Sequence, residues 1–252
     1  MVPPAQRAEP ESVKQRYARR RGRHTEWNSL DPAVYLAVQE KERALLRLFS
    51  RCGIGPLAEK RLLEIGCGSG DDLLNLIRLG FDPSLVVGLE LLEDRARAAR
   101  HRLPQAAEVI CGDAAETNLP AASFDVVMQS TVFTSLLDER FQERLADRMW
   151  SLVKPGGGVI WCDFVYDNPR NRDVRGVPVR RIRQLFPEGR LTMWRIALAP
   201  PISRRVTAVH PLLYPAFNVL PLLRTHALAW IAKPPSHGGA GIDAAGDTSP
   251  GR

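Results

Sequence analysis

The sequence predicts an α/β fold, in which short buried strands alternate with helices along the chain. An apolar run at 62–65 leads into a glycine-rich loop, and apolar residues with helical spacing follow at 73–79. Comparable apolar runs recur downstream, separated by turn-forming or helical segments, at 85–90, 108–111, 123–130 and 158–164. At 252 residues and 44% hydrophobic, the chain is long enough and apolar enough to bury one α/β core.

The loop after the first strand has glycine at every second position, and the strand before it carries one acid, Glu64. A strand, a glycine loop and a helix in this order present backbone N–H groups and a helix N-terminus to a ligand. The dinucleotide fingerprint requires glycine at position 71, which is Asp71 here, and the loop lacks the lysine of a P-loop. The loop therefore predicts a ligand site that differs from both of these phosphate sites.

Further acidic residues follow at the later strands. Glu90 ends the second strand roughly 20 residues beyond the loop, where a carboxylate accepts hydrogen bonds from ribose hydroxyls. Asp113 follows the third strand, Asp125 begins the fourth, and a Lys-Pro-Gly-Gly-Gly turn at 154–158 leads into the fifth. Any one of these acids is explained by a solvated strand end, but their order and spacing together predict a nucleoside-containing ligand.

The pattern E-x-G-x-G-x-G at 64–70, with the landmarks after it, resembles the class I S-adenosylmethionine-dependent methyltransferases over residues 61–164. The resemblance implies a Rossmann-like three-layer sandwich, with a seven-stranded, mostly parallel sheet that contains one antiparallel strand. We place the last two strands at about 190–198 and 227–232, which are apolar and of strand length.

The same resemblance implies S-adenosyl-L-methionine as the cofactor. The acid and the glycines of the loop correspond to the methionine end of the site, Glu90 to the ribose, and Asp113 with Ala114 to the adenine. The cofactor residues that we predict are Glu64, Gly66, Cys67, Gly68, Gly70, Glu90, Leu91, Asp113, Ala114 and Gln129.

The motifs of several methyltransferase subclasses are missing from the chain. The segment 129–133 does not match the motif of exocyclic-amino methylation, and no Pro-Cys nucleophile occurs. Gln129 stands where metal-dependent catechol enzymes have an acid, so we expect no metal. Positioning supplies most of the rate in methyl transfer, and a general base adds about 10²–10⁴-fold. The catalytic residue is left unassigned; candidate bases are His24, Asp163 and Asp167, whereas His101, His210 and His226 are expected to be structural.

Arginine dominates the charge of the chain, which is +7 with five lysines in total. A GC-rich genome explains this bias as well as an anionic partner does. Under the second interpretation, Tyr17, Arg170 and Arg175 are candidates for acceptor binding. The segments 167–176 and 222–226 resemble methyltransferases of bacterial polysaccharide gene clusters, which predicts O-methylation of a small molecule or glycan, including nucleotide- or lipid-linked sugars. Two alternatives stay open, an RNA methyltransferase and a non-catalytic cofactor-binding protein; no RNA-binding motif supports the first.

The chain is expected to contain one catalytic domain with additions. We divide it into a disordered tail (1–12), an N-terminal helical cap (13–56), a methyltransferase domain (57–233) with insertions at 166–189 and 199–224, and a second disordered tail (234–252). The second insertion predicts an apolar lid of short helices. Four cysteines without a C-x-x-C pair predict reduced thiols and a cytoplasmic location. No apolar run reaches the ~18 residues of a membrane span, so at most peripheral membrane contact is expected. The sequence indicates no oligomeric state.

Overall fold

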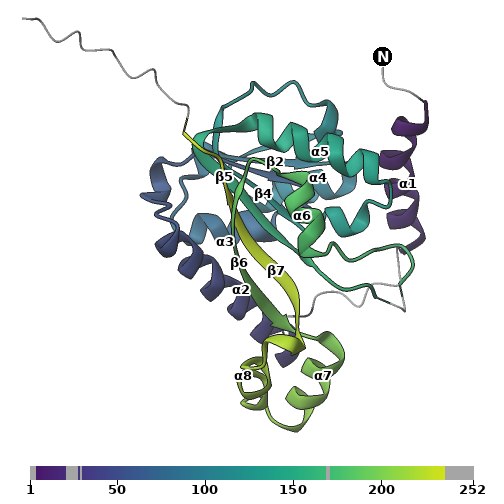
Figure 1. Ribbon diagram of the computed structural model, residues 1–252, viewed down its shortest axis with the longest axis vertical. Helices are drawn as coiled ribbons and strands as arrows, with labels where there is room; N and C mark the ends of the chain where they lie inside the picture. Colours follow the sequence, from purple (N-terminus) through teal and green to yellow (C-terminus); the bar gives the residue numbers. More distant parts are fainter. Residues whose placement is uncertain (1–3, 21–27, 29, 169–170, 236–252) are drawn as a thin grey trace, which may run out of the picture.

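The computed structural model describes residues 4–20, 28, 30–168 and 171–235. Seven strands form one sheet in the order β3-β2-β1-β4-β5-β7-β6 (Figure 1). β7 runs antiparallel to both of its neighbours, and the pairs among the first five strands are parallel. The predicted seven-stranded sheet with one antiparallel strand is confirmed. The strands are β1 (Leu62–Ile65), β2 (Val86–Glu90), β3 (Glu108–Cys111), β4 (Phe124–Ser130), β5 (Val153–Phe164), β6 (Arg190–Leu198) and β7 (Arg224–Ala232).

Helices cover both faces of the sheet, which makes the three layers. On one face lie α1 (Pro4–Arg20), α5 (Glu139–Leu152) and α6 (Val179–Leu185), and their apolar side chains pack against Leu63 and Ile65. On the other lie α2 (Pro32–Arg51), α3 (Asp71–Arg78) and α4 (Glu93–Arg102), which pack against Leu62. Successive β1 side chains point to opposite faces, so the continuous apolar run of this strand is explained by burial on both sides.

Within the N-terminal cap, the Asp-Pro pair at 31–32 predicts a helix over about 32–52, and this helix is present as α2. The Asp31 carboxylate caps the helix by accepting a hydrogen bond from Ala33 N at 2.9 Å, and Pro32 occupies the first turn. Proline suits this position because its missing N–H would have no partner within the helix. The helix ends at Arg51, next to the predicted end at Cys52.

The expected disordered tail over residues 1–12 is wrong from Pro4 onward, because α1 begins there. Long-range contacts hold this helix: Glu9 Oε1 accepts hydrogen bonds from Leu137 N at 2.7 Å and from Arg16 Nη2 at 2.6 Å. Arg16 also donates to Ser135 O at 2.9 Å, and Val13 is buried. Leu137 and Ser135 lie more than 110 residues away from their partners in the chain, so local composition does not reveal these contacts. Residues 1–3 and 236–252 of the two predicted tails lie outside the described residues.

The last two strands form the edge of the sheet and enclose the lid insertion. β6 has the predicted bounds, whereas β7 begins at Arg224, three residues before the predicted start at 227. The extra residues complete the pairing with β6, in which Leu198 lies opposite Arg224. Between these strands, α7 (Pro200–Val209), α8 (Leu213–Asn218) and the short turn η5 (Pro221–Leu223) form the predicted short helices. Figure 1 shows α7 and α8 together at one end of the molecule, beyond the ends of β6 and β7.

Candidate cofactor and acceptor site

A cleft of about 110 Å³ opens at the carboxyl ends of β1, β2 and β4. β1 pairs with β2 on one side and with β4 on the other, so the strand order reverses at this point. Open α/β sheets bind ligands in the crevice formed at such a reversal. Of the predicted cofactor residues, five line the cleft, namely Gly66, Glu90, Leu91, Asp113 and Ala114.

The glycine loop requires glycine for conformational reasons. Gly66, Gly68 and Gly70 have φ values of +68°, +57° and +83°, which side chains with a Cβ rarely adopt. A Cβ on Gly66 would lie 2.5 Å from Val132 Cγ2, and a Cβ on Gly68 would lie 2.4 Å from Arg95 Nη2. The alternating glycines therefore let the backbone turn from β1 into α3 and keep the cleft side of the loop free of side chains.

Glu90 holds the loop against the end of β2. Its side chain is 4% exposed, and its two carboxylate oxygens accept hydrogen bonds from Gly68 N at 2.8 Å and Leu92 N at 2.9 Å. Each carboxylate oxygen has a second lone pair, so the group can accept further hydrogen bonds from the cleft. Glu90 lines the cleft, and its predicted contact with a ribose stays a prediction.

Glu64 is a buried carboxylate that lacks a partner. It is 2% exposed on β1, and its Oε2 atom has no hydrogen bond. Burial, together with the nearby Asp72 carboxylate, raises the pKa of Glu64 well above its ordinary value. A buried acceptor without a donor is costly, so the site favours a ligand that brings a cation or an N–H group. The ammonium group of a methionine moiety has this chemistry, so the residues present fit the predicted cofactor.

Lys41 is a residue of the site that the sequence interpretation missed. It reaches from α2 and donates to Asp72 Oδ2 at 2.6 Å and to Ser130 Oγ at 2.9 Å. Burial lowers the pKa of Lys41, but Asp72, Cys162 and Glu64 together raise it by more, and the net pKa is raised. A permanent cation therefore lies beside Ser130, which lines the cleft. Its rarity was an available signal, since lysine occurs five times in an arginine-rich chain.

Tyr17 and Arg95 together close the ribose side of the cleft. Arg95 Cζ lies 5.2 Å from the centre of the Tyr17 ring, and both residues line the cleft. Burial lowers the pKa of Arg95, but Glu90, Tyr17 and Cys67 together raise it by more, so the guanidinium stays charged. Tyr17 lines the cleft, and its predicted contact with the acceptor stays a prediction; Arg95 was not predicted.

Two predicted cofactor residues lie behind the cleft. Gln129 is fully buried and its Oε1 atom accepts a hydrogen bond from Val132 N at 3.1 Å. This bond supports the turn at Thr131, a non-glycine residue with φ of +58°. Cys67 is 5% exposed, and a Cβ on Gly88 would lie 2.7 Å from its sulfur. Both residues shape the loops at the cleft from behind and are absent from its lining.

Asp113 lines the cleft next to the end of β3. Its side chain accepts a hydrogen bond from Ala115 N at 2.9 Å and caps the short turn η3 (Ala114–Glu116). Burial raises the pKa of this carboxyl group. The cap fixes the carboxylate at the end of β3, where the sequence predicted it.

The candidate bases are not gathered at the cleft. Asp163 is completely buried, accepts hydrogen bonds from Thr134 N at 3.2 Å and Phe164 N at 3.0 Å, and has its pKa raised to about 7 by burial. It supports the turn η4 (Phe133–Ser135) from below. Asp167 is exposed and accepts a hydrogen bond from Gly176 N at 2.8 Å. His24 lies outside the described residues.

Of the two predicted acceptor arginines, the structure describes Arg175, which is absent from the cleft lining. Arg175 donates to Leu137 O at 3.1 Å and pairs with Glu139 at 3.4 Å, which ties it to the start of α5. Arg170 lies outside the described residues. Neither residue is therefore seen beside the cleft.

His226 lies where β7 begins, beside the end of β5, and the sequence interpretation treated it as structural. Its ring centre is 4.0 Å from that of Phe164, and its Nδ1 atom is 3.1 Å from Thr225 Oγ1. Burial, with the positive charges of Lys41 and Arg195, lowers the pKa of His226 to about 4. A neutral imidazole at the carboxyl edge can accept a hydrogen bond at neutral pH.

Within the described part of the chain, no group of three or more His, Cys, Asp or Glu side chains is arranged to hold a metal ion. The expectation of a metal-free enzyme stays a prediction. The same residues contain no helix that combines the length and the apolar character needed to cross a bilayer.

The strand order with a single antiparallel strand, the glycine loop after β1 and the acids at the ends of β1 and β2 define the class I S-adenosylmethionine-dependent methyltransferase fold. Residues 62–157 match the family model described as a methyltransferase domain. The match and the fold support an S-adenosylmethionine-dependent methyltransferase, and solved proteins of similar fold have S-adenosylhomocysteine bound.

Two curated proteins illustrate the range of relatives. A fatty-acid O-methyltransferase of Mycolicibacterium smegmatis is 30% identical over 162 residues, which cover 61% of this chain and 58% of that protein. A tRNA N(3)-cytidine methyltransferase METTL2 of Gallus gallus is 26% identical over 118 residues, which cover 44% of this chain and 32% of that protein. The matches span about a third to somewhat more than half of these relatives.

A solved structure supports the fold over nearly the whole chain. The 1,6-didemethyltoxoflavin-N1-methyltransferase of Burkholderia thailandensis, with S-adenosylhomocysteine bound, has a TM-score of 0.58 at 15% identity. The match covers 93% of this chain and 92% of that one. The shared architecture therefore extends past the glycine-loop half to the strands β6 and β7.

Proposed function

We propose that the protein transfers a methyl group from S-adenosylmethionine to an oxygen atom of a small-molecule or glycan acceptor. The observation that carries the cofactor part is the unpartnered Glu64 Oε2 atom behind a loop of three positive-φ glycines. The resemblance to polysaccharide-cluster methyltransferases motivates the sugar hydroxyl as acceptor, and the fatty-acid O-methyltransferase among the relatives supports an oxygen atom.

Five residues in or near the cleft have proposed roles in holding the cofactor. Glu64 accepts hydrogen bonds from the ammonium group, and Lys41 attracts the carboxylate of the methionine moiety. Glu90 accepts the ribose hydroxyls while it holds Gly68, and Asp113 with Ala114 recognises the adenine. When bound, the cofactor supplies a methyl group that its sulfonium has already activated.

The protein's own contribution to the chemistry is orientation of the acceptor. Asp163 is too deeply engaged beneath η4 to reach an acceptor, and we propose His226 as the group that accepts the hydrogen bond of the acceptor hydroxyl. Its pKa of about 4 makes it a weak base, so its role is to aim the oxygen lone pair. Asp167 is exposed at the end of the strand β5 and is the second candidate. Well-oriented reacting groups gain on the order of 10⁵-fold or more without a strong base.

A panel of acceptors tests the proposal. The purified chain is incubated with isotope-labelled cofactor and with nucleotide-sugars, glycans, fatty acids, small phenols or amines, and mass spectrometry follows the label. Methylation of a sugar or another hydroxyl or carboxyl oxygen is expected. Transfer to amines alone, or to phenols alone, contradicts the proposed acceptor class.

A second candidate function is RNA methylation. The relatives named tRNA N(3)-cytidine methyltransferases and the net charge of +7 favour it. Transfer of label to tRNA, with binding that weakens steeply as salt rises, would support this function over the first. Cofactor binding without transfer to any acceptor would support the third alternative, a non-catalytic cofactor-binding protein.

We also propose a cytoplasmic location. All four cysteines are free thiols. Reduced thiols are typical of the cytoplasm, and recovery of alkylated, unpaired cysteines from the native host tests this assignment.

A further inference from the structure

The segment between β6 and β7 exposes an unusual amount of apolar surface. We use the name α7–α8 protrusion for residues 199–223, which comprise α7, α8 and η5. Four of its aliphatic side chains are 69–88% exposed: Val209, Leu212, Val219 and Leu222. Phe217 and Leu220 add 40% and 54% exposed side chains to the same segment. Exposed apolar side chains that gather in one segment are candidates for an interaction surface.

The charge of this region has a single sign. No Asp or Glu occurs between Gly189 and Pro235, whereas Arg204 and Arg205 are exposed on α7. α2 packs against α7 and adds two exposed arginines, Arg43 and Arg47. An apolar surface that is flanked by cations complements an anionic lipid surface, because apolar side chains enter the acyl boundary while cations meet phosphates.

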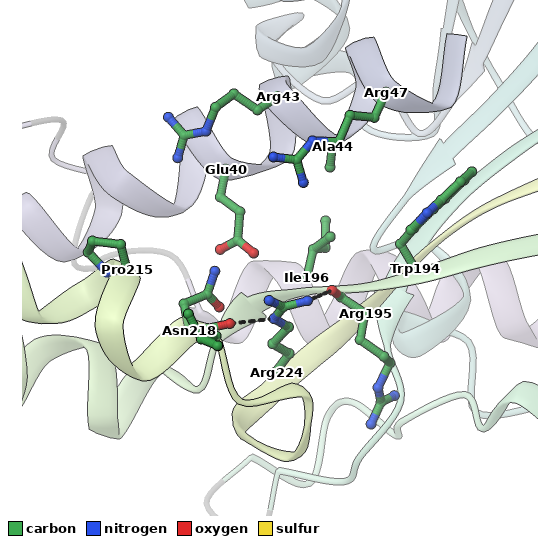
Figure 2. A pocket seen from close by; sticks show the side chains of 11 residues that line it. Glu40, Arg43, Ala44, Arg47, Trp194, Arg195, Ile196, Pro215, Asn218 and Arg224 are labelled. Atoms are coloured by element: carbon green, nitrogen blue, oxygen red, sulfur yellow. Dashed lines mark hydrogen bonds between the residues drawn. The ribbon is translucent and has the colours of Figure 1, made fainter. Parts of the chain in front are cut away.

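A cavity of about 240 Å³ lies next to the protrusion, between α2, β6 and α8 (Figure 2). Glu40 and Arg47 extend into it from α2, and Arg224 faces them from the start of β7. The Arg224 guanidinium is fixed by hydrogen bonds from Nε to Asn218 O at 2.7 Å and from Nη1 to Arg195 O at 3.0 Å. Two arginines that face a common space suit the oxygens of a phosphodiester.

The same cavity also offers acceptors. The Oδ1 atom of Asn218 is buried without a hydrogen-bond partner, and Glu40 accepts from Tyr214 Oη at 2.7 Å. An unpartnered buried oxygen favours a ligand that brings hydroxyl donors. A headgroup with a phosphodiester and hydroxyls, as in phosphatidylglycerol, satisfies both sets of groups. Pro215 and Val219 of α8 line this cavity, so the headgroup would lie beside the apolar surface.

From these observations we propose that the α7–α8 protrusion docks the protein onto an anionic phospholipid surface, with a phosphatidylglycerol-like headgroup in the cavity between α2, β6 and α8. The apolar residues of the protrusion enter the headgroup region, and the arginines hold lipid phosphates. The contact is peripheral, since none of the described helices is able to span a bilayer. Docking does not depend on which acceptor is methylated, so its test is independent of the test of the proposed function.

Vesicle flotation with the full chain tests the proposal. We expect binding to phosphatidylglycerol vesicles at least tenfold tighter than to phosphatidylcholine vesicles, and we expect it to weaken as salt rises. Loss of one arginine contact is expected to lower binding by about fivefold. Equal binding to both vesicles, or no binding to either, overturns the proposal.

Variants measure separately how the apolar side chains and the arginines contribute to vesicle binding. Leu212→Asp with Leu222→Asp is expected to lower vesicle binding at least tenfold, and Arg47→Gln is expected to reduce the preference for phosphatidylglycerol about fivefold. These side chains are exposed, so the variants should keep wild-type melting temperatures and cofactor affinity. Arg140→Glu, an exposed arginine on α5, is the matched control and should bind vesicles nearly as wild type does.

Two further outcomes identify another occupant. Binding of soluble glycerol 3-phosphate without vesicle binding would mean that the cavity takes a free anion, which overturns membrane docking. A dimer in light scattering that Leu222→Asp converts to a monomer, again without vesicle binding, would assign the apolar surface to a second copy of the chain. Vesicle binding by a chain that stays monomeric in solution supports the proposal.

Discussion

Glu64 offers a prediction with two effects of opposite sign. The substitution Glu64→Gln keeps the shape of the side chain and removes its charge. In the structure, this carboxylate is buried with an oxygen that no donor reaches, and burial with the Asp72 charge raises its pKa. The substitution should therefore stabilise the empty protein while it weakens cofactor binding.

The sign of the stability effect follows from proton binding. The unfolded chain has an ordinary glutamate pKa of about 4.3, which is lower than the pKa of Glu64 in the folded state. As pH rises from about 4.3 through the folded pKa, the unfolded state loses its proton first, and folding stability falls. Glu64→Gln removes this loss, so its melting temperature at pH 7 should exceed that of the wild type.

The size of the binding effect follows from the lost hydrogen bonds. A hydrogen bond to a charged group contributes about 1.5–3 kcal/mol. This corresponds to roughly a 10- to 150-fold rise in the Kd for S-adenosylhomocysteine, which isothermal titration calorimetry measures directly. Glu59→Gln, an exposed acid outside the cleft, is the matched control and should change neither quantity.

The two measurements together refute or support the assignment. Wild-type affinity in Glu64→Gln would mean that the carboxylate does not touch the cofactor. A melting temperature below the wild-type value would mean that the carboxylate stabilises the empty fold, contrary to its raised pKa and unpartnered oxygen.

Three other predictions concern the loop, the lysine and the edge histidine. Gly68→Ala places a Cβ 2.4 Å from Arg95 Nη2 at a φ of +57°, so calorimetry should show at least tenfold weaker cofactor binding; unchanged affinity would contradict the strained-loop argument. Lys41→Met removes the cation beside Asp72, and we expect about tenfold weaker cofactor binding. Lys14→Met, at an exposed lysine, is the control and should leave the cofactor affinity unchanged. The folded pKa of about 4 for His226 lies below the unfolded value of about 6.5, so stability should fall as pH drops from about 6.5 to 4. Urea unfolding at several pH values gives the dependence of the unfolding free energy on pH, and His226→Gln should lack the part of this dependence that the histidine causes. An unchanged dependence on pH would show that the histidine is not buried in its neutral form.

The sequence was most informative about features that a single position or a short segment determines. The glycines of the loop, Glu90 and Asp113 were predicted from spacing, because a positive φ and a carboxylate at a strand end are properties of single positions. The bounds of β6 were also predicted, since its apolar residues end where the proline-rich segment begins.

The sequence was least informative where the site depends on contacts between distant segments. Lys41 meets Ser130 across 89 positions, and Arg16 meets Ser135 across 119 positions. Neither contact has a local pattern, so the first part of α1 was taken as disordered and Lys41 was missed. Asp163 was a candidate base because it is an acid at the end of β5. In the structure its carboxylate is buried and accepts a hydrogen bond from Thr134 N of η4.

The most direct test of the account is a calorimetric titration of the purified wild-type chain with S-adenosylhomocysteine, NADH and ATP in parallel. The account predicts saturable one-to-one binding of S-adenosylhomocysteine and no binding of the other two ligands. Saturable binding of NADH or ATP, with no heat from S-adenosylhomocysteine, would contradict the assignment of the cleft.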